Sequence, residues 1–335
     1  MDKDTLVEVQ DLKTYFFTDE GVVKAVDGVD FSIKKGKTLC VVGESGCGKS
    51  ITARSIMRLI DPPGRIVEGS IKYVNGEGVE IDLTALSPKG QEIRKIRGME
   101  ISMIFQEPMS SLSPVHTIGE QIRESIRLHL GLSKEAAKER TIEVLKEVGI
   151  PKAEERYDNY PFQLSGGMRQ RVMIAMALAC KSRLLIADEP TTALDVTTQA
   201  NILDLIQGLQ KEYEMSVMFI THDLGVVAEI ADDAVVMYLG KVVERGPVDA
   251  IFHDPKHPYL ISLLRSIPQL TAGKMERLDS IRGMVPHPFN RPSGCPFHPR
   301  CDRAIKGRCD AAAPPRVILG PGREVSCFLY EEGRS

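Results

Sequence analysis

A glycine-rich segment between two apolar runs constrains the fold of this 335-residue chain more than any other feature. Residues 43–50 read Gly-Glu-Ser-Gly-Cys-Gly-Lys-Ser and fit the pattern of a phosphate-binding loop. The apolar run at residues 38–42 predicts a buried strand, and the spacing of residues 51–60 predicts a helix. Such a strand, loop and helix place backbone N–H groups and a positive helix end around a phosphate. The segment therefore predicts an α/β domain that binds phosphate.

Each position of this loop has an expected task. Gly43 and Gly48 let the backbone curl around the β-phosphate, Lys49 contacts the β- and γ-phosphates, and Ser50 ligates Mg²⁺. A helix N-terminus favours a negative charge, so we also expect the thiol of Cys47 to ionise and to be protected by bound nucleotide. The expected nucleotide contacts from this segment are Gly43, Ser45, Gly46, Cys47, Gly48, Lys49, Ser50 and Ile51.

Two further motifs follow in an order that supports nucleotide chemistry. An apolar run ends in two carboxylates, of which Asp188 is expected to hold Mg²⁺ through water and Glu189 to polarise the water that attacks the γ-phosphate. Before it, a Ser-Gly-Gly sequence starts an apolar helix and forms a second candidate anion site. That site consists of Ser165, Gly166 and Gly167.

The rest of the chain alternates between strand and helix patterns, which predicts an α/β protein. Residues 1–35 alternate as β-strands, residues 117–149 have helical spacing with Ser133 as a predicted N-cap, and residues 234–244 form a predicted hairpin. The formal charge of −3 argues against a nucleic-acid partner. The longest apolar stretch has nine residues, against about twenty for a membrane span, and no secretory signal is recognisable. We therefore expect a cytosolic protein.

In this order the motifs resemble those of the ATP-binding subunits of ABC transporters, across roughly residues 5–250. The resemblance implies further roles: a catalytic and Mg²⁺-binding glutamine at Gln106, a switch histidine at His222, and an aromatic residue, Phe16 or Tyr15, that stacks on adenine. Residues 193–195 resemble the family's D-loop. The resemblance to the family also implies a P-loop ABC-type nucleotide-binding domain with an antiparallel β subdomain and a helical insertion at about residues 107–165. The cofactors that the resemblance implies are ATP and Mg²⁺.

The resemblance is closer to one subfamily, the D-type ATPase of bacterial dipeptide and oligopeptide importers, which also includes nickel importers. The segments that carry it are residues 107–122, 168–178, 257–268 and 294–301, and Met168 in place of the usual glutamine is typical of that subunit. It implies an F-type sister ATPase as heterodimer partner, two integral membrane permease subunits, and indirectly an extracytoplasmic substrate-binding protein. The chain would then lie peripherally on the cytoplasmic face of the cell membrane. The cargo, peptide, nickel or another solute, is left open.

A different class stays open as an alternative. Soluble ABC ATPases act on ribosomes or chromosomes, and one such type carries iron–sulfur clusters. Those chains usually hold two ATPase domains or a long coiled coil, whereas this chain has one phosphate-binding loop and no heptad run. The sequence therefore favours transport.

The last part of the chain differs in composition, and we expect a domain boundary between residues 267 and 268. Residues 285–327 hold eight of the 20 prolines, which argues against regular helix or sheet, and seven basic residues against three acidic ones. Four cysteines with spacings of five, seven and seventeen residues lack the close pairs of zinc sites and suit a [4Fe–4S] cluster, with zinc or unligated thiols as the alternatives. The basic residues could offset the cluster's negative charge. These ligands would be Cys295, Cys301, Cys309 and Cys327.

Overall fold

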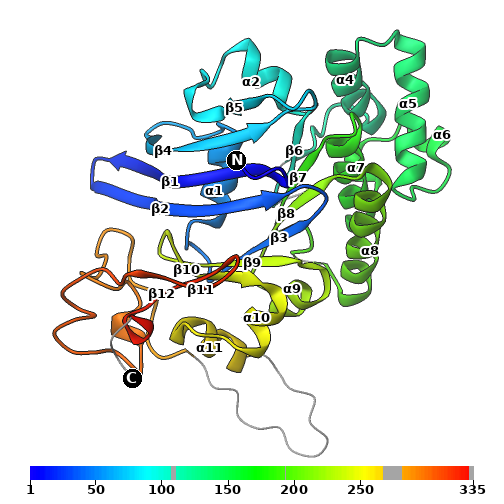
Figure 1. The fold of residues 1–335 in the computed structure, drawn as a ribbon. Coiled ribbons are helices and arrows are strands. Elements are labelled where there is room, and N and C mark those ends of the chain that lie inside the picture. The colour runs from blue at the N-terminus through cyan, green and yellow to red at the C-terminus, as the bar shows by residue number, and fades with distance from the viewer. Residues whose placement is uncertain (107–110, 193, 267–280, 332–335) are drawn as a thin grey trace, which may run out of the picture. The chain divides into compact units, whose positions relative to one another are not determined.

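The structure is a computed structural model that describes residues 1–106, 111–192, 194–266 and 281–331 (Figure 1). The chain divides into two compact units, each built from segments distant in sequence. Unit 1 comprises Met1–Val7, Ile33–Thr38 and Lys72–Ile220, and unit 2 comprises Glu8–Ser32, Leu39–Ile71 and Thr221–Ser335. Both units combine strands and helices, which confirms the predicted α/β class. The expected boundary at residues 267 and 268, and the expected start of the helical insertion at residue 107, lie outside the described residues.

Among the residues that the structure describes, unit 1 contains three parallel strands and most of the helices. Its central strand pairs on both sides, with Ala187 opposite Ile104 on one neighbour and opposite Phe219 on the other. The strands are β6 (Ile101–Ile104), β7 (Leu184–Asp188) and β8 (Ser216–Thr221), in that order, with the small β5 (Glu80–Asp82) pairing the end of β4 (Gly64–Val74). The helices are α2 (Gln91–Ile96), α4 (Ile118–Leu130), α5 (Lys134–Glu147), α6 (Ala153–Arg156), α7 (Gly166–Leu178) and α8 (Val196–Tyr213), with 3-10 turns η1 (Leu83–Ala85) and η2 (Pro161–Gln163).

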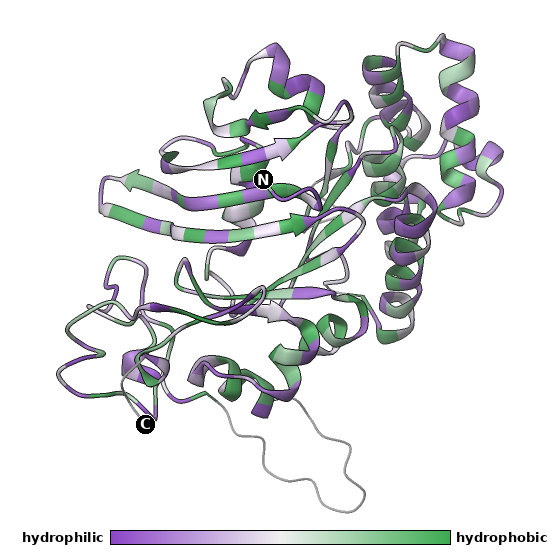
Figure 2. Ribbon diagram, viewed as in Figure 1, coloured by the Kyte–Doolittle hydropathy of each residue, from purple (hydrophilic) through white to green (hydrophobic). Residues whose placement is uncertain are grey.

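Local sequence explains these elements. All residues of β7 and β8 are buried, as a continuous apolar run requires, and Figure 2 shows them as hydrophobic ribbon. The predicted helical segment divides into α4 and α5. A capping box of Thr117 and Glu120 starts α4, Gly131 ends it in the left-handed region, and Ser133 caps α5 as predicted. The helices α4, α5 and α7 pack against one another (Figure 1).

Unit 2 contains the N-terminal strands, the glycine-rich loop and the tail. Its larger sheet has the order β11-β12-β10-β9-β3, in which only β3 and β9 are parallel, and its other strands have the order β2-β1-β4. The strands are β1 (Thr5–Thr18), β2 (Gly21–Lys34), β3 (Thr38–Val42), β9 (Asp233–Tyr238), β10 (Lys241–Pro247), β11 (Arg316–Gly320) and β12 (Arg323–Ser326). The helices are α1 (Lys49–Ile56), α9 (Leu224–Ile230), α10 (Val248–His253) and α11 (Pro258–Arg265), with 3-10 turns η3 (His298–Arg300) and η4 (Phe328–Tyr330).

The prediction that residues 285–327 contain no regular sheet is wrong. β11 and β12 form a hairpin with Val317 opposite Val325, and β12 also pairs with β10. The proline count averaged two different segments, because seven of the eight prolines precede Arg316 and the eighth, Pro321, lies in the turn of the hairpin. Prolines at turns do not interrupt a strand. The tail therefore extends the sheet that β3 belongs to.

Candidate nucleotide-binding elements and a cysteine-lined cavity

The glycine-rich loop of unit 2 lies between β3 and α1, as predicted, and its conformation requires glycine. Gly43 has a φ of 152° and Gly48 a φ of 102°. A Cβ atom on Gly43 would collide with the carbonyl oxygen of Met237, and one on Gly48 with that of Ala25. The backbone of neighbouring strands therefore packs closely around the loop, and only glycine fits at these two positions.

The charge of the loop comes from α1 and from Lys49. Gly48 is the N-cap of α1 and has no side chain to cap the helix, so the N-terminus of α1 offers the geometry with which helices bind anions. Lys49 is buried, and its Nζ donates to the carbonyl oxygens of Gly43, at 2.7 Å, and Glu44, at 3.3 Å. The loop thus folds around a cation, which suits a phosphate-binding loop.

The expectation that Cys47 ionises is wrong. The thiol is 2% exposed, and burial raises its pKa even though the Lys49 ammonium lies 4.0 Å from Sγ and opposes the shift. Desolvation of the thiolate outweighs the attraction of the nearby charge. Sequence alone placed Cys47 at a helix N-terminus but did not show that its side chain points into the protein.

Two residues with separately expected catalytic roles, Gln106 and Glu189, meet in unit 1. Gln106 Nε2 donates to Glu189 Oε2 at 3.0 Å, and the hydroxyl of Thr192 donates to the same oxygen at 3.0 Å. Asp188, the last residue of β7, is 3% exposed. Glu189 has a φ of 49°, in the left-handed region that costs a non-glycine residue about 1–2 kcal/mol. Backbone strain of this kind is concentrated at functional sites. The sequence did not indicate that Thr192 would contact Glu189.

The Ser-Gly-Gly motif begins α7 in unit 1. Ser165 is the N-cap, and its Oγ accepts the backbone N–H of Met168 at 3.3 Å. Ser165 and Gly166 are exposed, and Gly167 is partly exposed. The N-terminus of α7 is thus presented to solvent, where a ligand or another chain could reach it.

The remaining candidates lie in unit 2. Tyr15 and Phe16 are successive residues of β1 and point to opposite faces: the hydroxyl of Tyr15 donates to Asp27 at 2.6 Å, whereas a Cβ at Gly64 would overlap the Phe16 ring. Burial, followed by this hydrogen bond, raises the pKa of Tyr15 to about 12. His222 is exposed directly after β8.

All four tail cysteines line one small cavity of about 20 Å³ in unit 2, together with His257, His298 and Phe297. Burial, with a smaller contribution from the neighbouring thiols, raises the pKa of Cys295, Cys301 and Cys327 to about 11 each. Among the described residues, no three potential ligands converge as closely as a single metal ion requires. Tetrahedral zinc would bring thiolates within roughly 3.8 Å of one another. The donor set therefore matches a thiolate-bound group in type and in its shared cavity, but not in the spacing for one ion.

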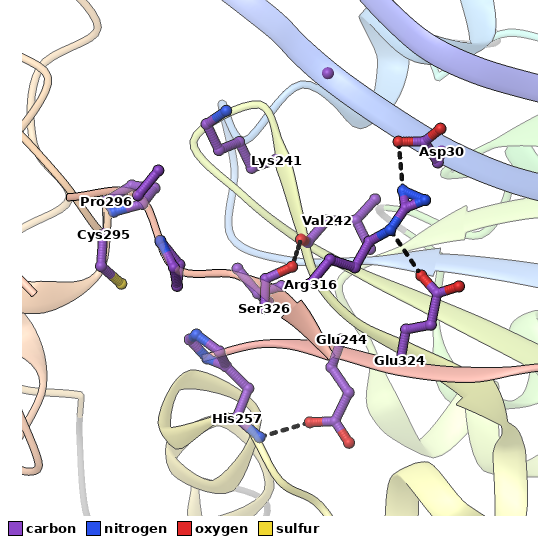
Figure 3. A pocket seen from close by; sticks show the side chains of 14 residues that line it. Asp30, Lys241, Val242, Glu244, His257, Cys295, Pro296, Arg316, Glu324 and Ser326 are labelled. Atoms are coloured by element: carbon purple, nitrogen blue, oxygen red, sulfur yellow. Dashed lines mark hydrogen bonds and ion pairs between the residues drawn. The ribbon is translucent and has the colours of Figure 1, made fainter. Parts of the chain in front are cut away.

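A larger neighbouring cavity of about 170 Å³ shares His257 and Cys295 with the first (Figure 3). Its far wall is an ion-pair network in which Arg316 contacts Asp30 at 2.6 Å and Glu324 at 3.2 Å. The expectation that the tail's basic residues balance a cluster is therefore wrong for most of them, because they pair with carboxylates of this chain. Those residues are Arg291, Arg300, Arg308, Arg316 and Arg323.

Comparison with known proteins agrees with these elements. Residues 26–192 match the family model "ABC transporter", and residues 243–309 match the model "Oligopeptide/dipeptide transporter, C-terminal region". The structure is similar to the dimeric post-hydrolysis state of the ATP-binding cassette MJ0796 bound to ADP and Pi, with a TM-score of 0.64, 28% identity, and coverage of 72% of this chain and 99% of that one. The chain belongs to the ABC transporter family, as an ATP-hydrolysing subunit.

Two relatives that align over nearly their whole length specify the branch of the family. The chain is 52% identical to the oligopeptide transport ATP-binding protein AppD of Bacillus subtilis, over 98% of both chains. It is 48% identical to the dipeptide transport ATP-binding protein DppD of Escherichia coli, again over 98% of both. The chain thus resembles peptide-transport ATP-binding proteins from end to end. No helix among its described residues is long and apolar enough to cross a membrane.

Proposed function

We propose that this chain is the ATP-hydrolysing subunit that powers uptake of dipeptides or oligopeptides through an ABC importer. The observation that carries the proposal is the end-to-end similarity to AppD and DppD, which includes the C-terminal region named for oligopeptide and dipeptide transporters. The phosphate-binding loop and the Gln106–Glu189 contact supply the chemistry that such a subunit needs. A soluble, non-transport ABC ATPase is the less favoured alternative.

In this function the loop binds the phosphates of MgATP, with Lys49 on the β- and γ-phosphates and Ser50 and Gln106 on Mg²⁺. Glu189 polarises the attacking water, and Asp188 holds Mg²⁺ through water. The exposed N-terminus of α7 supports a role in which Ser165, Gly166 and Gly167 contact ATP held by a partner ATPase. His222 contacts the γ-phosphate, and Phe16 or Tyr15 stacks on adenine.

The proposed partners are an F-type sister ATPase, two integral membrane permease subunits and, indirectly, an extracytoplasmic substrate-binding protein. The dimeric state of the similar cassette MJ0796 supports an ATPase dimer here. The chain then lies peripherally on the cytoplasmic face of the cell membrane.

We further propose that Cys295, Cys301, Cys309 and Cys327 hold a [4Fe–4S] cluster, with zinc as the alternative metal. Support comes from the cavity that all four cysteines line and from their sequence spacing, which lacks the close cysteine pairs of zinc sites. When bound, such a cluster supplies folding free energy to the segment that carries its ligands. The chain's own part is to hold four thiols around one buried space.

Transport in vesicles tests the function. The chain is assembled with its permease and sister subunits, and ATP-dependent uptake of labelled dipeptide, oligopeptide and Ni²⁺ is measured with saturating binding protein. We expect peptide uptake that Lys49→Ala abolishes. Ni²⁺ uptake without peptide uptake would reassign the cargo, and ATP hydrolysis with no affinity for the membrane subunits would favour the soluble class.

Metal analysis tests the cluster separately. Iron, acid-labile sulfide and zinc are measured on the full chain purified without air, together with the visible spectrum. About four irons and four sulfides per chain are expected. Stoichiometric zinc without visible absorption would replace the cluster by the alternative metal, and absence of both metals would refute the proposal.

A further inference from the structure

The segment that carries Cys295 and Cys301 also reaches the phosphate-binding loop. Arg300, the residue before Cys301, donates from both terminal nitrogens to the carboxylate of Glu44, at 2.6 and 3.0 Å. Its side chain is 5% exposed and that of Glu44 is 26% exposed. A bidentate arginine–carboxylate pair of this kind has strong geometric preference and fixes the orientation of both groups.

The same loop residue is held a second time through its backbone. The N–H of Glu44 donates to the hydroxyl of Tyr259 at 2.8 Å. Tyr259 packs at 4.8 Å from Tyr238 and 5.3 Å from Phe297 between ring centroids, and all three rings are fully buried. Phe297 comes from the cysteine-bearing segment, so that segment supports both the side chain and the main chain of Glu44.

A second arginine of the tail holds the turn on which the loop rests. Arg291 donates to Asp27 at 2.9 Å and to the carbonyl oxygen of Leu239 at 2.5 Å. The next residue, Gly240, donates its N–H to the carbonyl oxygen of Cys47 at 2.8 Å. The loop is therefore contacted from two directions by groups that the tail holds in place.

We propose that Arg300 is a positioning residue of the phosphate-binding loop, which it holds through Glu44 in the conformation that accepts the phosphates of ATP. The cysteine-bearing tail thereby contributes to the affinity for nucleotide, although none of its residues needs to touch ATP. This inference rests on the proposed nucleotide role of the loop. Arg300 acts on binding rather than on the chemical step, because its partner lies at the beginning of the loop and not at Glu189.

The test compares Arg300→Gln with Arg300→Lys, with Glu44→Gln and with a matched control. A double variant combines Arg300→Gln and Glu44→Gln. Arg303→Gln is the control, since the exposed Arg303 lies in the same segment and lines the same cysteine cavity, whereas Arg300 is the residue that binds Glu44. Affinity for MgADP is measured by calorimetry on the full chain, and KM for ATP and kcat are measured on the assembled transporter. Wild-type chain that fails to bind MgADP would refute the proposed function, which separates that failure from failure of this inference.

We expect Arg300→Gln to weaken MgADP binding and raise KM for ATP about tenfold, with kcat within a factor of two. Arg300→Lys recovers part of the affinity, Arg303→Gln behaves as wild type, and the double variant is no weaker than the weaker single one. Wild-type affinity in Arg300→Gln, or equal losses in Arg303→Gln, would overturn the proposal. If Arg300→Gln does not fold, Glu44→Gln removes the same pair from the loop side, and unchanged affinity in that variant is equally decisive.

Discussion

Replacing Glu189 by glutamine removes the proposed general base while keeping the hydrogen bonds around it. In the folded chain one carboxylate oxygen, Oε2, accepts hydrogen bonds from Gln106 and Thr192, both at 3.0 Å. An amide oxygen at the same position can accept both, and the amide fills the same volume. The left-handed backbone at residue 189 is equally strained with either side chain. Glu189→Gln is therefore expected to fold and to bind MgATP as the wild type does.

The loss in Glu189→Gln is then confined to proton transfer. A positioned general base contributes about 10²–10⁴ in rate, which is roughly 3–5 kcal/mol of activation free energy at about 1.4 kcal/mol per factor of ten. We expect kcat of the assembled transporter to fall by about that factor. Because the nucleotide still binds, the affinity for MgATP is expected to change by less than about twofold.

The assay is steady-state phosphate release by the assembled transporter, with nucleotide affinity measured on the same preparation. Glu212→Gln serves as the control, because Glu212 is an exposed residue of α8 and the same substitution changes charge equally. Hydrolysis by Glu189→Gln within about threefold of wild type would remove Glu189 from the role of base. A loss of MgATP affinity as large as the loss of hydrolysis would show instead that the Glu189 side chain acts in nucleotide binding.

Three further predictions concern unit 2. Cys47 is buried and its pKa is raised, so its thiol is expected to react slowly with maleimide in the folded chain, with or without MgATP. Rapid labelling that MgATP blocks would instead support an accessible, ionised thiol. Gly43→Ala is expected to abolish MgADP binding, since its Cβ would collide with Met237, and calorimetry against wild type tests this. Burial alone would raise the pKa of Asp27, but the Tyr15 hydrogen bond and nearby cations outweigh burial and lower it. The carboxylate therefore stabilises the fold above its usual pKa of about 3.9 and loses this effect as pH falls through the lower folded value. Asp27→Asn is thus expected to lower the melting temperature at pH 7, with a gap that narrows below about pH 4; a gap independent of pH would contradict the assignment.

Features encoded within a short stretch of sequence were predictable. The strand, glycine loop and helix around Lys49 follow from one motif, and Ser133 caps α5 because the cap and its N–H partner lie three residues apart. Gln106 and Glu189 lie 83 residues apart, and only the family resemblance associated them. Thr192 was missed because a threonine after a turn carries no signal of its own.

Features that depend on distant contacts were not predictable. Cys47 was expected to ionise because the sequence shows its position just before α1 but not the packing around its side chain. The excess of basic residues in the tail was attributed to a cluster, whereas Arg300 pairs with a carboxylate 256 residues away. The hairpin β11–β12 was missed because the proline count covered residues 285–327 as a whole, although seven of the eight prolines precede the hairpin. In each case a local property of the sequence was outweighed by a partner brought close by the fold.

The sheet of unit 2 offers a structural reason why the tail and the loop are coupled. β12 pairs with β10, β10 with β9, and β9 runs parallel to β3, whose end delivers the loop. The turn between β9 and β10 contains Gly240, which contacts Cys47, so the strands that receive the tail also carry a direct contact to the loop. Backbone hydrogen bonds thus join the hairpin of the tail to the strand that precedes the loop in one sheet, and the Arg300–Glu44 pair adds a second connection between tail and loop. Loss of order around the cysteines would then release one side of the loop while the sheet keeps the other in place, which reduces nucleotide affinity without unfolding the site.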